Sequence, residues 1–118
     1  MAWEVEGTEE FHSWFAGLTS AERISVAAKI DLLEQKGPSL GRPHVDTLKG
    51  SKFTNLKELI IQHGGNPYRV IFAIDPRRTA ILLLGGRKTD NKWYKTAIPK
   101  AEVIYDRYLE EIKGEGLI

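Results

Sequence analysis

Lysine, arginine and aromatic residues are interleaved along the middle of this 118-residue sequence. Cations neutralise phosphate groups and aromatic rings stack on unpaired bases, so the combination is typical of proteins that bind single-stranded nucleic acid. The same residue types could cut RNA without a metal. Arg and Lys would stabilise the charge that develops when a 2′-hydroxyl attacks the adjacent phosphorus, and His, Tyr, Lys or a carboxylate would move the protons. The residues concerned are Lys57, Tyr68, Arg69, Arg77, Arg78, Arg87, Lys88, Lys92, Trp93, Tyr94 and Lys95.

The charge of the chain is unevenly distributed. Its 17 Lys and Arg and 16 Asp and Glu give a net charge of only +1, yet residues 49–100 hold 11 cations and 3 acids, a net charge of +8. Residues 1–48 carry a net charge of −4, and residues 101–118 carry one of −3. Such segregation steers a polyanion to one surface. The alternative is that these cations only solvate loops and strand edges.

Several other chemistries are excluded or weakly supported. The chain has no cysteine, which rules out disulfides, thiol nucleophiles and iron–sulfur clusters. Its histidines lack the spacing of a metal site and no serine lies in a G-x-S-x-G motif, so we expect neither a metal nor a cofactor. His44 and Asp46 are a candidate acid–base pair on a long loop, although a solvated histidine beside an Asx turn explains them more simply.

Some of the aromatic and basic residues have structural explanations. Alternate residues of a strand face the core, so Tyr68 could be a packing residue. Trp93 could simply cover apolar surface. Arg87 and Lys88 follow two glycines at the end of a predicted strand, where a turn would present both cations together. This segment lacks the spacing of a phosphate-binding loop.

Capping signals predict three helices in a single α+β domain that spans residues 1–118. A first helix extends from Thr8 to about Gly17, and a capping box at Thr19–Glu22 starts a second helix that ends at Gly37-Pro38. The last helix is predicted to start near Pro99, because proline favours the first helical position.

Between the helices, apolar runs separated by turn residues predict an antiparallel meander. We also expect a short edge strand at the N-terminus, and we expect the tail to fray. The predicted segments are the edge strand at 3–5, an irregular loop at 40–53, meander strands at 56–62, 68–74 and 79–84, a basic loop at 85–99 and the tail at 114–118.

Membrane insertion and export are not expected. The longest apolar run, Ala80–Leu84, is far shorter than the ~20 residues of a membrane span. The N-terminus is acidic and lacks the apolar stretch of a signal peptide. The sequence therefore predicts a cytoplasmic protein.

Three sequence blocks, taken together, are informative about the family. They are K-E-L at 57–59, R-x-x-F-A-x-D-P-x-R at 69–78 and G-G-x-K at 85–88, preceded by the loop sequence at 37–51. In these blocks the chain resembles the RelE/ParE superfamily of type II toxin–antitoxin toxins, and within it the HigB-like, phage-derived branch. The resemblance extends from Trp3 to about Glu111.

The resemblance implies a fold and an activity. The fold would be α+β, with N-terminal helices packed on a small antiparallel sheet and a C-terminal helix. The activity would be ribosome-dependent cleavage of mRNA without a metal, which inhibits translation. The partner would be a cognate antitoxin with a helix-turn-helix domain, besides the ribosome and mRNA, and this chain alone would bind no specific DNA.

The resemblance also implies roles for single residues. Catalysis would depend on Arg69, Lys88 and Tyr94. Glu58 could orient an arginine or act as an acid or base, as could His44 and Asp46. Contacts to RNA phosphates or bases would come from Lys57, Arg77, Arg78, Arg87, Lys92 and Trp93.

Two departures from the family pattern keep other functions open. Ile60 stands where an arginine usually follows K-E-L, and Arg87 stands where close relatives often have aspartate. A gained and a lost arginine could relocate a phosphate contact or weaken the toxin. The alternatives are a non-catalytic inhibitor of DNA gyrase, as in ParE-type members, and a degenerate toxin that only binds its antitoxin.

Overall fold

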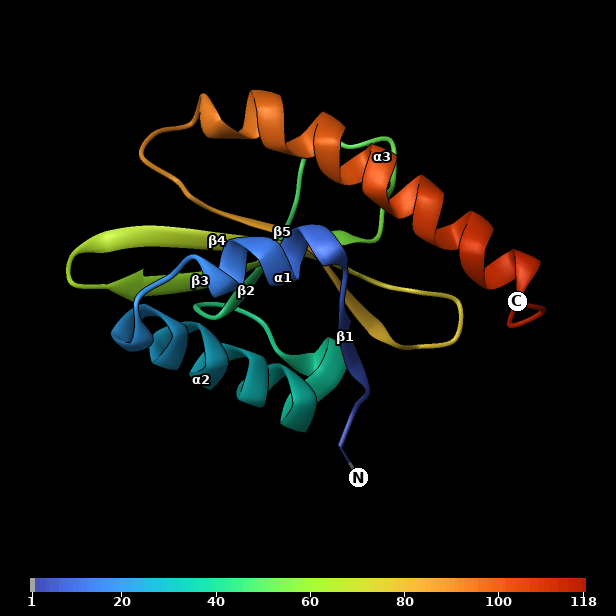
Figure 1. The fold of residues 1–118 in the computed structure, drawn as a ribbon, viewed down its shortest axis with the longest axis horizontal. Coiled ribbons are helices and arrows are strands. Elements are labelled where there is room, and N and C mark those ends of the chain that lie inside the picture. The colour runs from blue at the N-terminus through green and yellow to red at the C-terminus, as the bar shows by residue number, and fades with distance from the viewer. Residues whose placement is uncertain (1) are drawn as a thin grey trace.

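A five-stranded sheet lies between two helical layers in the computed structural model, which describes residues 2–118 (Figure 1). The strand order is β1-β5-β4-β3-β2. The elements are β1 (Val5–Gly7), α1 (Glu9–Ala16), α2 (Ser20–Lys36), a 3-10 turn η1 (Gly37–Ser39), β2 (Val45–Thr47), β3 (Leu56–His63), β4 (Asn66–Ile74), β5 (Ala80–Arg87) and α3 (Trp93–Gly114).

The predicted meander forms the centre of the sheet, with two additions at its edges. Strands β3, β4 and β5 are consecutive antiparallel neighbours, as predicted. β1 pairs with β5 in parallel, so the sheet is mixed and the expectation of a purely antiparallel sheet is corrected. β2 pairs with β3 inside the segment predicted to be irregular. Both additions have three residues, and such short strands depend on pairing with a distant partner that local sequence does not reveal.

The two faces of the sheet bury separate apolar cores. Because side chains alternate along a strand, Val70 and Phe72 of β4 face α1 and α2, whereas Ile71 and Ala73 face α3. Figure 1 shows α3 crossing one side of the sheet, with α1 and α2 on the other. Residues on the α3 face and those on the α1–α2 face therefore meet different surroundings, which decides which predicted site residues can act together.

Both N-terminal helices begin at the predicted caps. The Thr8 hydroxyl accepts a hydrogen bond from the Phe11 N–H and donates one to the Leu83 carbonyl of β5, which fixes α1 on the sheet. Thr19 and Glu22 form a complete capping box at α2. Gly37, at φ +58°, then ends α2, as predicted for a glycine that precedes a proline.

Helix α3 begins at Trp93, six residues before the predicted start, and contains Pro99. The Asp90 carboxylate accepts the Lys92 N–H just before the helix begins. Trp93 and Tyr94 pack against the core on the α3 face, and this burial stabilises a first turn that proline-based reasoning assigns to a loop. The consequence for the site is large, because Tyr94 belongs to a helix that faces the sheet.

The end of α3 is closed by backbone hydrogen bonds. Gly116, at φ +75°, and Leu117 donate to the carbonyls of Lys113 and Ile112, which is a Schellman motif. Fraying of residues 114–118 is a matter of motion and stays a prediction. Across residues 2–118, none of the helices is long and apolar enough to cross a bilayer.

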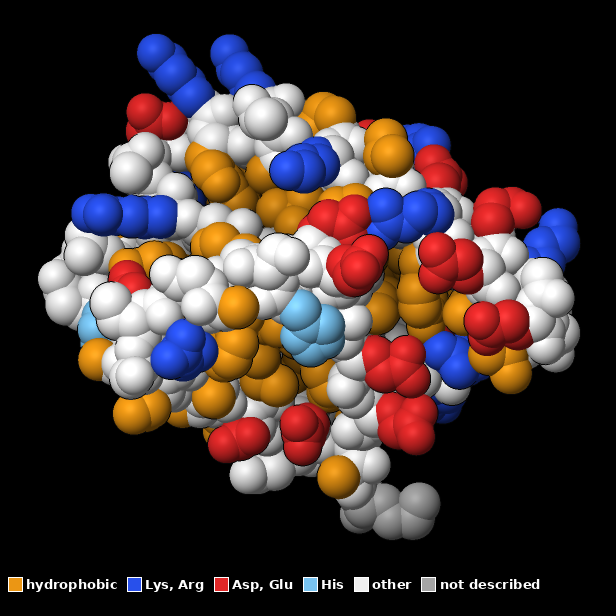
Figure 2. All heavy atoms as spheres, in the orientation of Figure 1, with side chains coloured by type: hydrophobic (Ala, Val, Ile, Leu, Met, Phe, Trp, Pro, Cys, Tyr) orange, Lys and Arg blue, Asp and Glu red, His pale blue; other side chains and the backbone are white. Residues whose placement is uncertain are grey.

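Charged side chains are segregated over the surface. In Figure 2 acidic side chains gather over the C-terminal half of α3 and the neighbouring start of α1. Lys and Arg side chains project around the N-terminal end of α3 and the β3–β4 hairpin. Part of the basic middle of the sequence thus gathers at one end of the molecule, whereas Arg77 and Arg78 lie in the β4–β5 turn.

Candidate functional site

Four polar side chains that are distant in sequence meet on the α3 face of the sheet. Tyr94 donates a hydrogen bond from its hydroxyl to Glu58 Oε1 over 2.5 Å, and Arg69 Nε lies 3.1 Å from the same oxygen. Lys88 Nζ lies 5.6 Å from the centre of the Tyr94 ring. We call Glu58, Arg69, Lys88 and Tyr94 the polar cluster. Three of its members are the residues predicted to be catalytic, and the fourth is the carboxylate predicted to orient an arginine.

The strand register explains why these residues meet. Glu58 pairs with Ile71 and Ile60 pairs with Arg69, so Glu58 and Arg69 lie on one face of neighbouring strands. On the other side of β4, Arg69 pairs with Gly86. A Cβ atom at Gly86 would lie 2.7 Å from Trp93 Nε1. The missing side chain lets Trp93 lie on β5 and brings the next residue, Tyr94, over the sheet.

Replacing Gly86 with alanine should therefore disturb both stability and the site. We expect the free energy of unfolding to fall by about 1–3 kcal/mol, the usual cost of overpacking, because the Trp93 ring must move. Urea unfolding measures this change. Gly114→Ala is the control, since nothing lies within 4 Å of a Cβ built at Gly114. Equal stabilities of the two variants would contradict the proposed close approach of Trp93 to β5.

The polar cluster is mostly shielded from water. The side chains of Arg69 and Glu58 are 13% and 11% exposed. Burial and the hydrogen bond to Glu58 raise the pKa of Tyr94 to about 12, so its hydroxyl is protonated and donating at neutral pH. Among residues 2–118, Arg69 Nε is the one buried side-chain nitrogen or oxygen without a properly aligned hydrogen-bond partner. Such an unsatisfied donor is unusual in a folded protein.

The tyrosines provide a test of this environment. All four tyrosines have a raised pKa. Burial is the main cause for Tyr94, Tyr105 and Tyr108, and a hydrogen bond to Glu22 is the main cause for Tyr68. A raised pKa in the folded state stabilises the protein below pH 10, and this contribution is lost as the pH rises through the folded value.

We therefore expect little tyrosinate absorbance at pH 10 in the folded protein, and a loss of stability between pH 10 and 12. Ultraviolet titration of the wild type and of Tyr94→Phe measures the tyrosinate absorbance. The variant should lack one group that titrates near pH 12. A tyrosine that ionises at pH 10 in the wild type and is missing from the variant would place Tyr94 in water instead.

A pocket of about 390 Å³ opens beside the polar cluster. Glu58 and Tyr94 form part of its wall, and the rest comes from β2, the segments that flank it and the loop before α3. Asp46 of β2 is the cross-strand neighbour of Glu58 and binds Arg42 over 3.0 Å. The residues that line the pocket are Arg42, Asp46, Thr47, Leu48, Lys49, Glu58, Asn91 and Tyr94.

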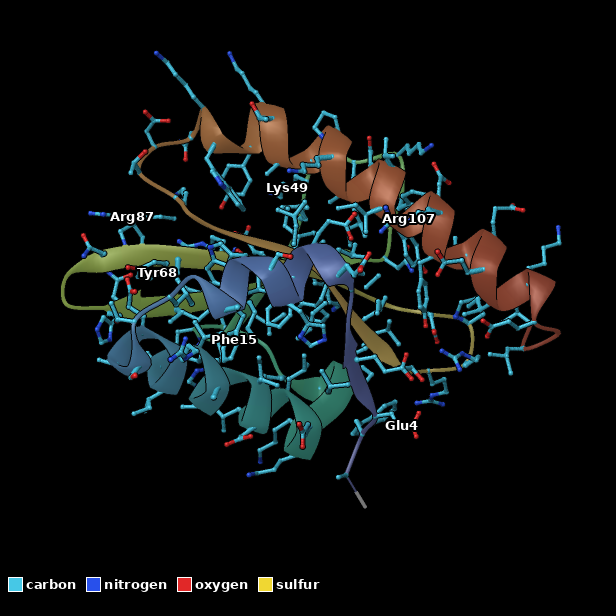
Figure 3. All side chains as sticks on the ribbon, viewed as in Figure 1. Glu4, Phe15, Lys49, Tyr68, Arg87 and Arg107 are labelled. Carbon is cyan, nitrogen blue, oxygen red and sulfur yellow. The ribbon has the colours of Figure 1, made fainter. Side chains whose placement is uncertain are left out.

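The other predicted RNA contacts are dispersed. Lys57 and Arg87 are adjacent in sequence to Glu58 and Lys88, so strand alternation directs Lys57 to the α1–α2 face. Arg87 pairs with Tyr68, a residue of the α1–α2 core, and hydrogen-bonds Asn66 near the hairpin (Figure 3). We therefore leave both cations out of the site proposed below. Lys92, which is exposed, and Trp93 lie at the start of α3, next to the polar cluster.

Arg77 and Arg78 lie in the β4–β5 turn. At a rise of ~3.3 Å per strand residue, this turn is about 20 Å from Arg69. Arg77 binds the carboxylate of Asp75 and donates to the Tyr108 hydroxyl, and Arg78 stacks on Trp3. Both arginines thus have structural contacts, and we also leave them out of the proposed site.

His44 does not join Asp46 in an acid–base pair. Its Nδ1 lies 2.6 Å from Lys29 Nζ of α2, on the far side of the sheet from the polar cluster. Asp46 instead lines the pocket. Residues two apart on a strand point to the same face, but His44 lies before β2 begins. Its side chain contacts α2 instead, which separates it from that of Asp46.

Sequence reasoning identifies three residues of the pocket wall and misses the other five, which are Arg42, Thr47, Leu48, Lys49 and Asn91. Four of the five lie in or beside β2, within the segment expected to be irregular, and Asn91 precedes a helix turn expected to be a loop. Figure 3 shows Lys49 beneath the first half of α3. The strand β2 contains the β-branched residues Val45 and Thr47 on either side of Asp46. This pattern favours a strand, but three residues are too few to identify one from the sequence.

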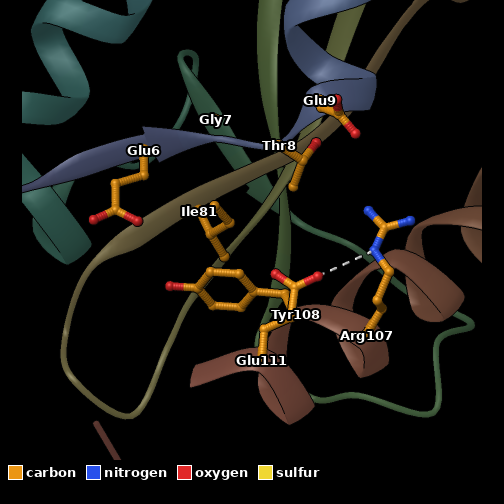
Figure 4. Close-up of a pocket in the computed structure, with 8 residues that line it drawn as sticks. All are labelled: Glu6, Gly7, Thr8, Glu9, Ile81, Arg107, Tyr108 and Glu111. Atoms are coloured by element: carbon orange, nitrogen blue, oxygen red, sulfur yellow. Dashed lines mark ion pairs between the residues drawn. The ribbon is translucent and has the colours of Figure 1, made fainter. Parts of the chain in front are cut away.

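A second pocket, of about 410 Å³, lies between β1, the start of α1 and α3 (Figure 4). Glu6, Glu9 and Glu111 line it together with Arg107. Arg107 is engaged by Glu10 over 2.7 Å and by Glu111 over 3.8 Å. Three carboxylates would repel a phosphate, so an RNA site fits the polar cluster and not this pocket.

The fold is shared with solved RelE toxins. The structure resembles the isolated E. coli RelE toxin with a TM-score of 0.57 at 15% identity, covering 84% of this chain and 98% of that one. It resembles RelE in the archaeal RelE–RelB complex from Pyrococcus horikoshii with a TM-score of 0.55 at 20% identity, covering 75% and 98%. These identities are low, so the likeness concerns the fold.

Sequence comparison identifies the family. Residues 13–106 match the family described as Phage derived protein Gp49-like, and the chain belongs to this family. It is 46% identical over 105 residues to a Mycobacterium tuberculosis protein named as toxin HigB3, covering 87% of this chain and 90% of the relative. It is 35% identical to another, named as toxin HigB2, covering 96% of this chain but 57% of that relative. The protein is thus a HigB-like toxin of a type II toxin–antitoxin system, which confirms the resemblance seen in the sequence.

Proposed function

We propose that this toxin inhibits translation by cutting mRNA on the ribosome, without a metal, at the polar cluster. The observation that carries the proposal is the meeting of Glu58, Arg69, Lys88 and Tyr94 from three elements and a loop. In this reaction the 2′-oxygen of the RNA attacks the adjacent phosphorus. A carboxylate or a phenol can move the protons, and two cations can stabilise the charge that develops.

The reaction begins with removal of a proton from the 2′-hydroxyl. Glu58 accepts this proton as the 2′-oxygen bonds to phosphorus. Tyr94 and Arg69 both contact Glu58 Oε1, so the second carboxylate oxygen is left for the substrate. Since the pKa of Tyr94 is about 12, Tyr94 acts as a hydrogen-bond donor and not as the base.

Arg69 and Lys88 stabilise the negative charge on the phosphoryl oxygens. Arg69 uses one N–H for the Tyr68 carbonyl, and a guanidinium has five, so donors are left for a phosphate. The bond from phosphorus to the 5′-oxygen breaks, and the Lys88 ammonium gives that oxygen a proton. The products are a 2′,3′-cyclic phosphate and a 5′-hydroxyl, and proton exchange with water restores Glu58 and Lys88.

The proposal is tested by expressing the toxin in bacteria without an antitoxin and mapping the 5′ ends of cellular mRNA. We expect growth arrest and new ends inside translated reading frames. Lys88→Ala should remove both, because no other cation of the cluster can protonate the leaving oxygen. Lys113→Ala is the charge-matched control, since Lys113 lies exposed in the last turn of α3. Arrest with intact mRNA would contradict the proposal and indicate another target, such as gyrase.

We further propose that a cognate antitoxin neutralises the toxin. The support is that a related fold has been solved as a RelE–RelB complex, together with the membership of a toxin–antitoxin family. A helix-turn-helix domain in the antitoxin would bind the DNA of the operon, and this chain would contribute no specific DNA contact. Co-expression of the cognate antitoxin should restore growth and give a complex that co-purifies.

A further inference from the structure

We propose that the pocket beside the polar cluster is a guanine subsite, in which Asp46 reads the base next to the cleaved phosphate. The inference rests on the proposed cleavage of RNA and names its base preference. Glu58 and Tyr94 belong both to the polar cluster and to the pocket wall. A nucleotide whose phosphate contacts Arg69 and Lys88 would therefore place its base in or near this pocket.

The size and the apolar surfaces of the pocket suit a nucleobase. Its volume of about 390 Å³ falls within the ~300–1,000 Å³ of small-molecule sites. Leu48, which is 5% exposed, provides an apolar contact, and the Tyr94 ring forms part of the wall. RNA-binding proteins read unstacked bases by such stacking together with hydrogen bonds to their Watson–Crick edges.

The polar atoms of the wall favour guanine. Asp46 and Glu58 offer acceptors only, whereas Lys49 and the Asn91 amide offer donors. Guanine alone among the four RNA bases has two adjacent donors, N1–H and N2–H, on its Watson–Crick edge, and a carboxylate can accept both. Its O6 and N7 are acceptors that Lys49 and Asn91 can serve. Adenine and cytosine place an acceptor beside their single amino group and would oppose a carboxylate.

Asp46 is oriented for this role and can be released from its present partner. Asp46 Oδ1 accepts the Thr47 N–H over 2.9 Å, which fixes the carboxylate. Hydrogen bonds from Arg42 and Thr47 hold the pKa of Asp46 below its usual value, so it is ionised at neutral pH. The Arg42 side chain is 78% exposed, and an ion pair of this kind contributes little to stability. Arg42 can therefore move aside when a base enters.

The test is the binding of guanosine 3′-monophosphate and adenosine 3′-monophosphate to the purified toxin, measured by calorimetry. We expect guanosine 3′-monophosphate to bind at least about tenfold more tightly, as expected for a bidentate contact. Asp46→Asn should remove this preference, since an amide presents a donor to N1–H or N2–H. Arg42→Ala should keep it. Equal affinities in the wild type, or an unchanged ratio in Asp46→Asn, would overturn the subsite.

Mapping of cut sites separates this inference from the proposed function. The wild type should cut beside guanine more often than composition predicts, and the cuts that Asp46→Asn makes should lack that bias. Cutting with no base bias in the wild type would overturn the subsite and leave the ribonuclease assignment standing. Nucleotide binding that depends on Asp46, in a protein that cuts no RNA, would support the subsite and overturn the proposed function.

Discussion

Replacing Arg69 with alanine should lower the rate of mRNA cleavage by about 10²–10³-fold, the usual cost of removing one group that stabilises a developing oxyanion. Arg69 is the buried cation of the polar cluster, and its Nε has no aligned hydrogen-bond partner in the free protein. A phosphate would satisfy the guanidinium. The rate is measured as the appearance of cut ends on ribosome-bound mRNA at a fixed toxin concentration.

Two further variants separate catalysis from folding. Arg69→Ala leaves the Glu58 carboxylate without its ion pair, so a lost fold could mimic lost catalysis. Arg69→Lys keeps the positive charge beside Glu58 and loses only the planar guanidinium, so we expect a folded protein with cleavage still reduced at least ~10-fold. Arg87→Ala removes a cation from the opposite face of the sheet and should retain activity. Full activity of a folded Arg69→Lys, or loss in Arg87→Ala, would relocate the site.

The largest effect on stability is expected at Asp75. Its side chain is fully buried and accepts the N–H groups of Arg77 and Thr79 over 2.8 and 3.0 Å and the Tyr108 hydroxyl over 2.6 Å. Asp75→Ala would leave these donors without a partner and the Arg77 guanidinium without its buried counter-charge. Breaking a buried ion pair costs about 3–5 kcal/mol, and we expect that decrease in the free energy of unfolding by urea.

An exposed aspartate provides the matched control. Asp106 pairs with Lys52 over 2.8 Å, but both side chains are at least half exposed. Exposed pairs contribute about 0–1 kcal/mol, so Asp106→Ala should unfold nearly as the wild type does. If Asp75→Ala lowered stability no more than Asp106→Ala, the buried network at the β4–β5 turn would not be structural. Arg77 would then again be available as an RNA contact.

Local signals predicted the elements that local interactions stabilise. Thr8 and Thr19 cap helices with hydrogen bonds to residues three positions on, and the three central strands coincide with apolar runs. The start of α3 and the strand β2 were missed because their stability comes from distant partners: Trp93 packs on Gly86, and Asp46 pairs with Glu58. Pro99 is a genuine helix-start signal that burial of the preceding turn overrides.

The sequence predicted which types of residue form the candidate site, but it placed only some of the individual residues correctly. Arg69, Lys88 and Tyr94 were named from the family resemblance, and the structure brings them together with Glu58. The resemblance also implied RNA contacts for Lys57 and Arg87, although adjacent strand residues face opposite sides and both are neighbours of residues in the polar cluster. Ile60 pairs with Arg69 and is half-buried, so the arginine usual in the family would lie next to the polar cluster. Lys88 provides a cation there from the β5–α3 loop.

The chemistry of the cut ends tests the central claim most directly. Purified toxin is added to ribosomes stalled on a defined mRNA, and the new ends are analysed in the wild type, Lys88→Ala and Lys113→Ala. Attack by the 2′-hydroxyl predicts a 2′,3′-cyclic phosphate and a 5′-hydroxyl, produced by the wild type and Lys113→Ala and reduced at least ~100-fold in Lys88→Ala. A 5′-phosphate would show hydrolysis by water instead. Such ends, or cyclic-phosphate ends that form equally fast without Lys88, would contradict the mechanism assigned to the polar cluster.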